Sequence, residues 1–156
     1  MGEIRFYRLG EEGVDGTLPL LLERVLARGQ RALVRAGMAE ALPRLDARLW
    51  TYAPDSFLPH GIAGGPHDAD QPVLLTTDTG RNGADVLFLT DGARVDPAEA
   101  DDLAMIVRLF EDRDGEAVAQ AREDWRAVTQ AQKEAVFWAR EGGKWVEKAR
   151  SSASGS

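Results

Sequence analysis

The chain has 156 residues, a net charge of −7, 44% hydrophobic residues and no cysteine. Its length suits one domain with its own core, and the absence of cysteine excludes disulfides and thiolate metal sites. The acidic balance opposes direct binding to nucleic acid, whose phosphates attract basic surfaces. We find no secretion signal and no apolar run of membrane-spanning length, so we expect a soluble, cytoplasmic protein without membrane contact.

Strands and helices are predicted to alternate along most of the chain. In order, the expected elements are a strand at 4–9, a helix at 17–30, a strand at 31–35, a helix at 38–49, strands at 72–77 and 84–90, a helical turn at 97–102 and an apolar run at 103–110. Pro43 marks either a kink or the true start of the second helix. The alternation predicts an α/β, Rossmann-like three-layer fold with a mainly parallel central sheet and helices on both faces.

The last predicted element is one long helix, residues 115–141. Apolar residues recur in it at three- and four-residue spacing, as one face of a helix requires: Val118, Ala121, Trp125, Val128, Ala131, Ala135 and Trp138. Residues 150–156 are small and polar, which predicts a disordered tail after a single domain of residues 1–149.

The first strand–helix turn is the expected position for a nucleotide in such a fold. Its glycines, at positions 10, 13 and 16, do not follow the G-x-G-x-x-G fingerprint. Glu11, Glu12 and Asp15 also bring carboxylates to the position of the phosphates. We therefore expect no bound nucleotide and no catalytic site, with a nucleotide-dependent enzyme as the alternative.

Two patterns resemble metal sites without completing one. His60 and His67 could join Asp68 or Asp70 around a metal ion, but nothing in the sequence fixes that geometry. The acidic residues at 112, 114 and 116 lack the central glycine and the final glutamate of a calcium loop. We expect neither a metal nor a cofactor.

Large apolar side chains gather in the stretch of residues 49–65, which is rich in proline and glycine. It contains Trp50, Phe57, Leu58, Pro59 and His60. Because connections normally run over the surface, these groups either fold back onto the core or await a partner. Composition alone favours the core, whereas aromatic side chains on a rigid loop are typical of a binding hot spot.

Basic and aromatic residues alternate on the predicted last helix. Arg122 and Arg126 are one turn apart, Trp125 lies between them, and Lys133 follows two turns later. They form either a solvated face beside a buried tryptophan or a cationic, aromatic pocket. The second interpretation suits an acidic peptide that ends in an aromatic residue, because arginine binds carboxylates bidentately.

Four motifs carry a resemblance to a known family. They are FYRL at 6–9, LDARLW at 45–50, DSFLPHGIAG at 55–64 and AREDW at 121–125. With these motifs in this order, the chain resembles the chi subunit of bacterial DNA polymerase III. The resemblance covers nearly the whole chain except its final tail, and its most specific part is the L-W pair followed by S-F-x-P-H.

The resemblance implies a non-catalytic accessory subunit of the clamp-loader assembly that acts in DNA replication. Members of the family bind the acidic C-terminal tail of the single-stranded-DNA-binding protein, and some bind the psi subunit, which links chi to the clamp loader. Arg122 and Trp125 match positions of the tail site, whereas Arg126 and Lys133 are added from helical spacing alone.

The aromatic stretch matches a second surface of the family, used for psi or for a competing helicase. Trp50, Phe57 and Pro59 match its positions, and we assign Leu58 and His60 to the same surface. A scaffold for a helicase in DNA repair is therefore a further alternative.

Overall fold

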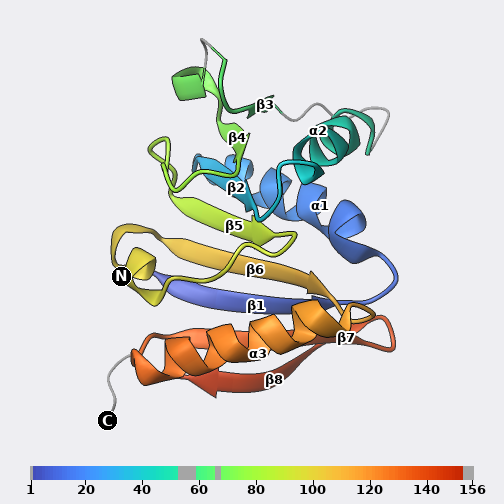
Figure 1. Ribbon diagram of the computed structural model, residues 1–156, viewed down its shortest axis with the longest axis vertical. Helices are drawn as coiled ribbons and strands as arrows, with labels where there is room; N and C mark the ends of the chain where they lie inside the picture. Colours follow the sequence, from blue (N-terminus) through green and yellow to red (C-terminus); the bar gives the residue numbers. More distant parts are fainter. Residues whose placement is uncertain (1, 53–58, 66–67, 153–156) are drawn as a thin grey trace.

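The computed structural model describes residues 2–52, 59–65 and 68–152. Within this part, one eight-stranded sheet has the order β3-β4-β2-β5-β6-β1-β7-β8 (Figure 1). The strands are β1 (Glu3–Leu9), β2 (Ala32–Ala36), β3 (Gly61–Ile62), β4 (Val73–Thr76), β5 (Val86–Thr90), β6 (Met105–Glu111), β7 (Ala135–Glu141) and β8 (Lys144–Ser151). The helices are α1 (Gly13–Ala27), α2 (Ala41–Thr51) and α3 (Gly115–Gln130), with short 3-10 turns η1 (Asp68–Asp70) and η2 (Pro97–Asp102). All neighbouring strands are parallel except β7 and β8, which are antiparallel.

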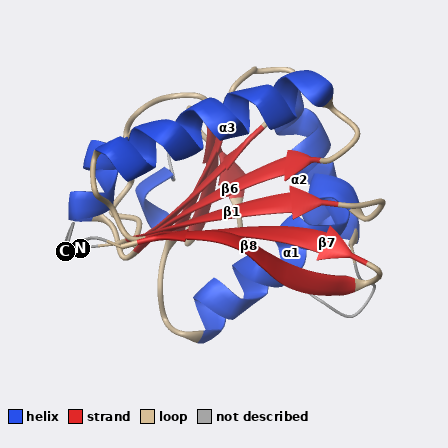
Figure 2. Cartoon of the chain, turned by 90° about the horizontal axis from the view of Figure 1, so that it is seen from below, coloured by secondary structure: helices blue, strands red, loops and turns tan. Residues whose placement is uncertain are grey.

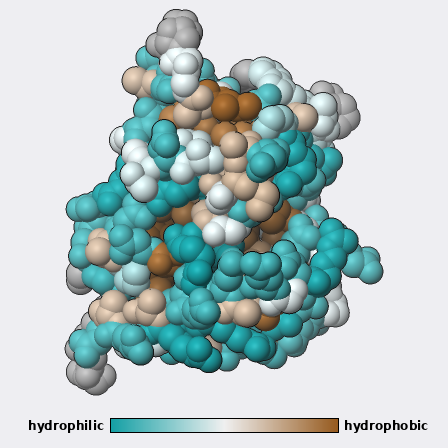
Figure 3. Space-filling model, in the orientation of Figure 1, coloured by the Kyte–Doolittle hydropathy of each residue, from teal (hydrophilic) through white to brown (hydrophobic). Residues whose placement is uncertain are grey.

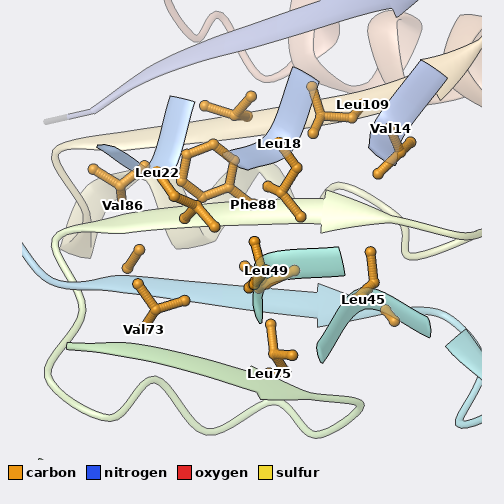
Figure 4. Close-up of a cluster of buried hydrophobic side chains, with 14 of the residues drawn as sticks. Val14, Leu18, Leu22, Leu45, Leu49, Val73, Leu75, Val86, Phe88 and Leu109 are labelled. Carbon is orange, nitrogen blue, oxygen red and sulfur yellow. The ribbon is translucent and has the colours of Figure 1, made fainter. Parts of the chain in front are cut away.

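Helices cover both faces of the sheet, as Figure 2 shows. On one face, α1 and α2 pack through Leu18, Leu22 and Leu45 against Phe88 and its neighbours (Figure 4). On the other face, α3 packs through Val118, Ala121 and Val128. The predicted α/β class, the mainly parallel sheet and the helices on both faces are confirmed.

The prediction of one helix over 115–141 is wrong, because α3 ends at Gln130. After the cap residue Ala131, Gln132 adopts a left-handed conformation with φ 57°. The Gln132 N–H donates to the Thr129 carbonyl at 3.1 Å, and the Lys133 N–H donates to the Val128 carbonyl at 3.1 Å. This is a Schellman ending. A glycine normally signals it, and here the position holds a glutamine.

The residues after α3 form a hairpin. Gly142 and Gly143 connect β7 to β8 with φ values of 57° and 79°, as a type I′ turn requires. Trp138 therefore lies on a strand and not on a helix face. The tail predicted from residue 150 begins too early, because Arg150 and Ser151 still belong to β8.

Two further predictions are resolved at helix starts. α1 begins at Gly13, which has φ 59°, and Thr17 lies inside the helix instead of capping it. Pro43 falls in the first turn of α2, so it shifts the start of that helix to Ala41.

The helical turn predicted over 97–102 is confirmed as η2. Within the described residues, no helix is both long and apolar enough to cross a membrane.

Candidate functional site

A groove of about 570 Å³ lies between α3 and the β7–β8 hairpin. We call it the α3 groove. Its lining comes from β1, from α3, from the hairpin and from the residue after β6, and comprises Arg8, Asp112, Arg122, Trp125, Arg126, Phe137, Ala139, Arg140, Glu141, Lys148 and Ala149. The structure thus brings together three of the residues predicted for the tail site, namely Arg122, Trp125 and Arg126.

The floor of the α3 groove is aromatic. Trp125 meets Phe6 edge to face with ring centroids 5.5 Å apart, and it meets Phe137 in the same way at 5.8 Å. Phe6 and Phe137 stack at 5.7 Å because they are register partners on parallel β1 and β7. Trp125 is only partly buried, so one part of its ring belongs to the core and another part faces the groove. An aromatic side chain of a ligand can pack against this floor.

The rim of the groove carries basic side chains, of which some form ion pairs and others do not. Arg122 and Arg126 are exposed, and neither has an acidic partner within 4.0 Å among the residues that the structure describes. By contrast, Arg8 pairs with Asp112, and Lys148 pairs with Glu141 at 2.9 Å. Two unpaired guanidinium groups beside an apolar floor favour a ligand with both a carboxylate and an aromatic group. In Figure 3 the surface around α3 and β8 is mostly hydrophilic, as expected for such a rim.

Lys133 lies outside the α3 groove. Its ammonium group pairs with Asp101, a residue of η2, at 2.6 Å. The assignment of Lys133 depended on a helix that continued past Gln130, and that helix ends before it. The helical-spacing argument therefore holds for Arg126 and fails for Lys133.

Three basic residues of the groove were missed from the sequence, namely Arg8, Arg140 and Lys148. Arg140 lies on β7, in the segment that we predicted as helix, and Lys148 lies on β8, in residues 142–149, for which we predicted no element. The pair of glycines between two strand-like segments, AVFWARE and KWVEKARS, was the available signal, because Gly-Gly favours a tight hairpin.

A buried polar network fixes α3 against the sheet. Asp124 is 3% exposed and accepts hydrogen bonds from Arg94 Nε at 2.9 Å and from the Val95 N–H at 3.0 Å. Its carboxylate also lies 3.7 Å from Nε of Arg108, which is 1% exposed. Burial lowers the pKa of Arg108, and the charge of Asp124 opposes this shift. Asp124 thus holds the helix that presents Arg122 and Trp125.

The second predicted surface is only partly described. Trp50, on α2, is 53% exposed, and its ring lies 4.8 Å from the ring of His60. His60 is buried and lies 3.0 Å from Asp46, so it supports Trp50 from beneath. Pro59 is half-buried. The predicted positions Phe57 and Leu58 lie outside the described residues.

A separate pocket of about 480 Å³ lies at the carboxyl ends of β5 and β6, beside the starts of α1 and α3. Nucleotides bind at this edge in many open parallel sheets. Here, however, carboxylates occupy the helix starts: Glu111 accepts from the Val14 N–H at 3.3 Å, and Asp114 accepts from the Ala117 N–H at 3.1 Å. Asp15 and Asp91 add negative charge to the same pocket. This arrangement opposes phosphate binding, because carboxylates already use the N–H groups that would receive a phosphate.

The predicted metal ligands can be compared only in part. Asp68 accepts from the N–H groups of Gly64 and Gly65 at 2.9 and 3.1 Å, which fits a loop-stabilising role. Among the described residues, no group of three or more potential ligands is placed to hold a metal ion. His67 lies outside that part of the chain.

A comparison with protein families matches most of the chain. The family described as DNA polymerase III chi subunit, HolC, matches residues 1–135. No curated protein shows a significant match to the chain.

Proposed function

Because the chain belongs to the DNA polymerase III chi subunit family, we propose that it is a non-catalytic adaptor in DNA replication. In this proposal it has a Rossmann-like fold and connects the polymerase assembly to the single-stranded-DNA-binding protein by binding that protein's acidic C-terminal tail. The observation that carries the proposal is that Arg122 and Arg126 lie above the aromatic floor of the α3 groove without an acidic partner in the described part of the chain.

The expected mode of binding follows from the chemistry of the groove. The terminal aromatic ring of the tail packs against Trp125 and Phe137, and its free carboxylate accepts hydrogen bonds from Arg122. Acidic residues just before the terminus face Arg126 and Lys148. Each charge-assisted hydrogen bond contributes about 1.5–3 kcal/mol. A few of them, together with packing of the aromatic ring, suffice for a micromolar Kd, which corresponds to a binding free energy of about −8 kcal/mol.

A peptide titration tests the proposal. We expect a short acidic peptide ending in Pro-Phe to bind the wild-type chain, and Arg122→Ala to weaken binding by about 10- to 100-fold. The variant should keep wild-type stability, because the Arg122 side chain is exposed and makes no ion pair in the described part of the chain. Affinity should also fall with added salt, because the site is open to solvent.

Lys133→Ala is the matched control. It removes a neighbouring cation that pairs with Asp101 away from the groove, so peptide affinity should not change. A peptide with its terminal carboxylate amidated should lose most of its affinity for the wild type and little for Arg122→Ala. Equal affinity of wild type and Arg122→Ala for the free-acid peptide would refute the site.

A second protein contact is proposed at the end of α2, because a tryptophan that is 53% exposed and supported by a buried histidine suits a hot spot. The partner in this proposal is psi, the clamp loader or a helicase. Copurification with wild type and with Trp50→Ala tests it, and loss of the helicase alone would favour the repair scaffold over the replication adaptor. Retention of every partner by Trp50→Ala would refute the surface.

A further inference from the structure

The opposite face of the β1–β7–β8 region carries a second groove, of about 490 Å³, between α1 and the hairpin. We call it the α1 groove. Its floor is formed by Tyr7, Trp138 and Trp145, and Leu20 on α1, which is 53% exposed, lies at its edge. Alternation along the strands explains the division: Phe6 and Phe137 face α3, whereas their chain neighbours Tyr7 and Trp138 face the other way.

The α1 groove combines an aromatic floor with cations. Tyr7 and Trp145 meet edge to face with centroids 5.1 Å apart, and the Arg140 guanidinium lies 5.0 Å from the centre of the Trp145 ring. Arg24 lines the same groove, is exposed and has no ion pair among the described residues. Among the described residues that line it, Glu12 is the one acidic residue, and its carboxylate lies 4.0 Å from Nε of Arg140. The groove is therefore net positive on a chain whose net charge is −7.

The two grooves adjoin at the free end of the hairpin. Arg140 lines both grooves and lies on β7 just before the Gly142–Gly143 turn. A peptide anchored by its terminus in the α3 groove can thus pass Arg140, which brings positive charge to both grooves, and continue into the α1 groove.

We infer that the α1 groove binds the acidic segment that precedes the terminal residues of the peptide bound in the α3 groove; this inference rests on the proposed function. Carboxylates of that segment face Arg24 and Arg140, and an apolar side chain packs on Tyr7 and Trp145. The observation that selects this occupant is charge complementarity together with continuity through Arg140. The chain would then bind an extended acidic peptide along both grooves, with the β7–β8 hairpin between them.

A length series tests the inference. A short peptide ending in Pro-Phe and the same peptide extended at its N-terminus by acidic and apolar residues are titrated into wild type, Arg24→Ala, Arg28→Ala and Arg122→Ala. The extended peptide should bind wild type about tenfold more tightly than the short one, as one additional charge-assisted contact allows. Arg24→Ala should remove this advantage and leave the short peptide unaffected.

Arg28→Ala is the matched control, because Arg28 is an exposed arginine one turn further along and does not line the groove. It should leave both affinities unchanged, whereas Arg122→Ala should weaken both peptides. In NMR spectra, the indole N–H signal of Trp125 should shift with either peptide, and those of Trp138 and Trp145 only with the extended one.

The outcomes separate this inference from the proposed function. If the extended peptide gains no affinity, or if its gain survives Arg24→Ala, the α1 groove is not its site, while binding that depends on Arg122 still supports the adaptor. If neither peptide binds wild type, the proposed function fails and this inference fails with it.

Discussion

Removing the Asp124 carboxylate is expected to be the most damaging single change on α3. Asp124→Ala leaves the guanidinium of Arg108, which is 1% exposed, without its nearest counter-charge and the Val95 N–H without an acceptor. Removing one partner of a buried ion pair costs about 3–5 kcal/mol, against a total stability of about 5–15 kcal/mol for a typical domain. The separation of 3.7 Å between Asp124 and Arg108 is long for a hydrogen bond, so we expect a loss toward the lower end of that range.

Urea denaturation followed by tryptophan fluorescence measures this loss, with an unchanged m-value showing that the comparison is sound. Glu123→Ala is the matched control. Glu123 is the chain neighbour of Asp124 and also pairs with Arg94, at 3.0 Å, but its side chain is 61% exposed. A surface pair contributes about 0–1 kcal/mol, so the control should lose much less stability.

A double variant separates the charge from the other contacts of Asp124. If the buried charge of Arg108 causes the loss, Arg108→Met should cost less in the Asp124→Ala background than in wild type, because an apolar side chain needs no counter-charge. The coupling free energy should reach about 1–3 kcal/mol, as for residues within one network. Strictly additive losses, or equal losses for Asp124→Ala and Glu123→Ala, would refute the reasoning.

Two other predictions concern the ion pair between Arg35 and Glu99 and the end of α3. The Arg35 guanidinium, which donates to Glu99 at 2.8 and 3.1 Å, holds the pKa of that carboxyl below its usual value. The Glu99 contribution to stability is therefore present above the unfolded-state pKa and is lost as pH falls through the lower folded-state pKa. Glu99→Gln should flatten this acid-side loss in pH-dependent denaturation, and an unchanged profile would contradict it. Gln132→Gly should stabilise the chain by up to about 1 kcal/mol, because glycine adopts φ 57° without the steric cost of a side chain; a fall in thermal midpoint would count against the Schellman ending.

Strands β1, β2, β4 and β5 and helices α1 and α2 followed from patterns of hydrophobic residues and turns. Apolar runs such as residues 86–90 are buried along their whole length, as expected of a strand covered on both faces. The end of α3 did not follow, because a three- to four-residue apolar spacing continues across Gln132 and the stop is made by a left-handed glutamine. Helical spacing and strand alternation overlap in residues 135–138, and only the Gly142–Gly143 turn distinguished them.

Some residues of the candidate site could likewise be predicted from the sequence, and others could not. Arg122, Trp125 and Arg126 were recognisable because they share one helix, where spacing alone predicts proximity. Arg8 and Lys148 belong to distant strands, and the sheet order that joins β1 to the hairpin through β7 is set by tertiary packing. The role of Trp125 was also only half predictable, because its contacts with Phe6 and Phe137 make it both core and groove floor.

The β7–β8 hairpin contributes to both grooves and lies almost entirely beyond the residues that match the family. The family match ends at residue 135, where β7 begins, so Phe137, Arg140 and Lys148 lie beyond it. Arg122 and Trp125 lie within the match and would bind the terminal residue of a peptide, which is the part of recognition that the proposed function requires. The hairpin supplies the opposite wall of the α3 groove and one wall of the α1 groove. We therefore expect substitutions at Arg122 to decide whether a tail binds at all, and substitutions along β7 and β8 to decide how much of its acidic sequence is read.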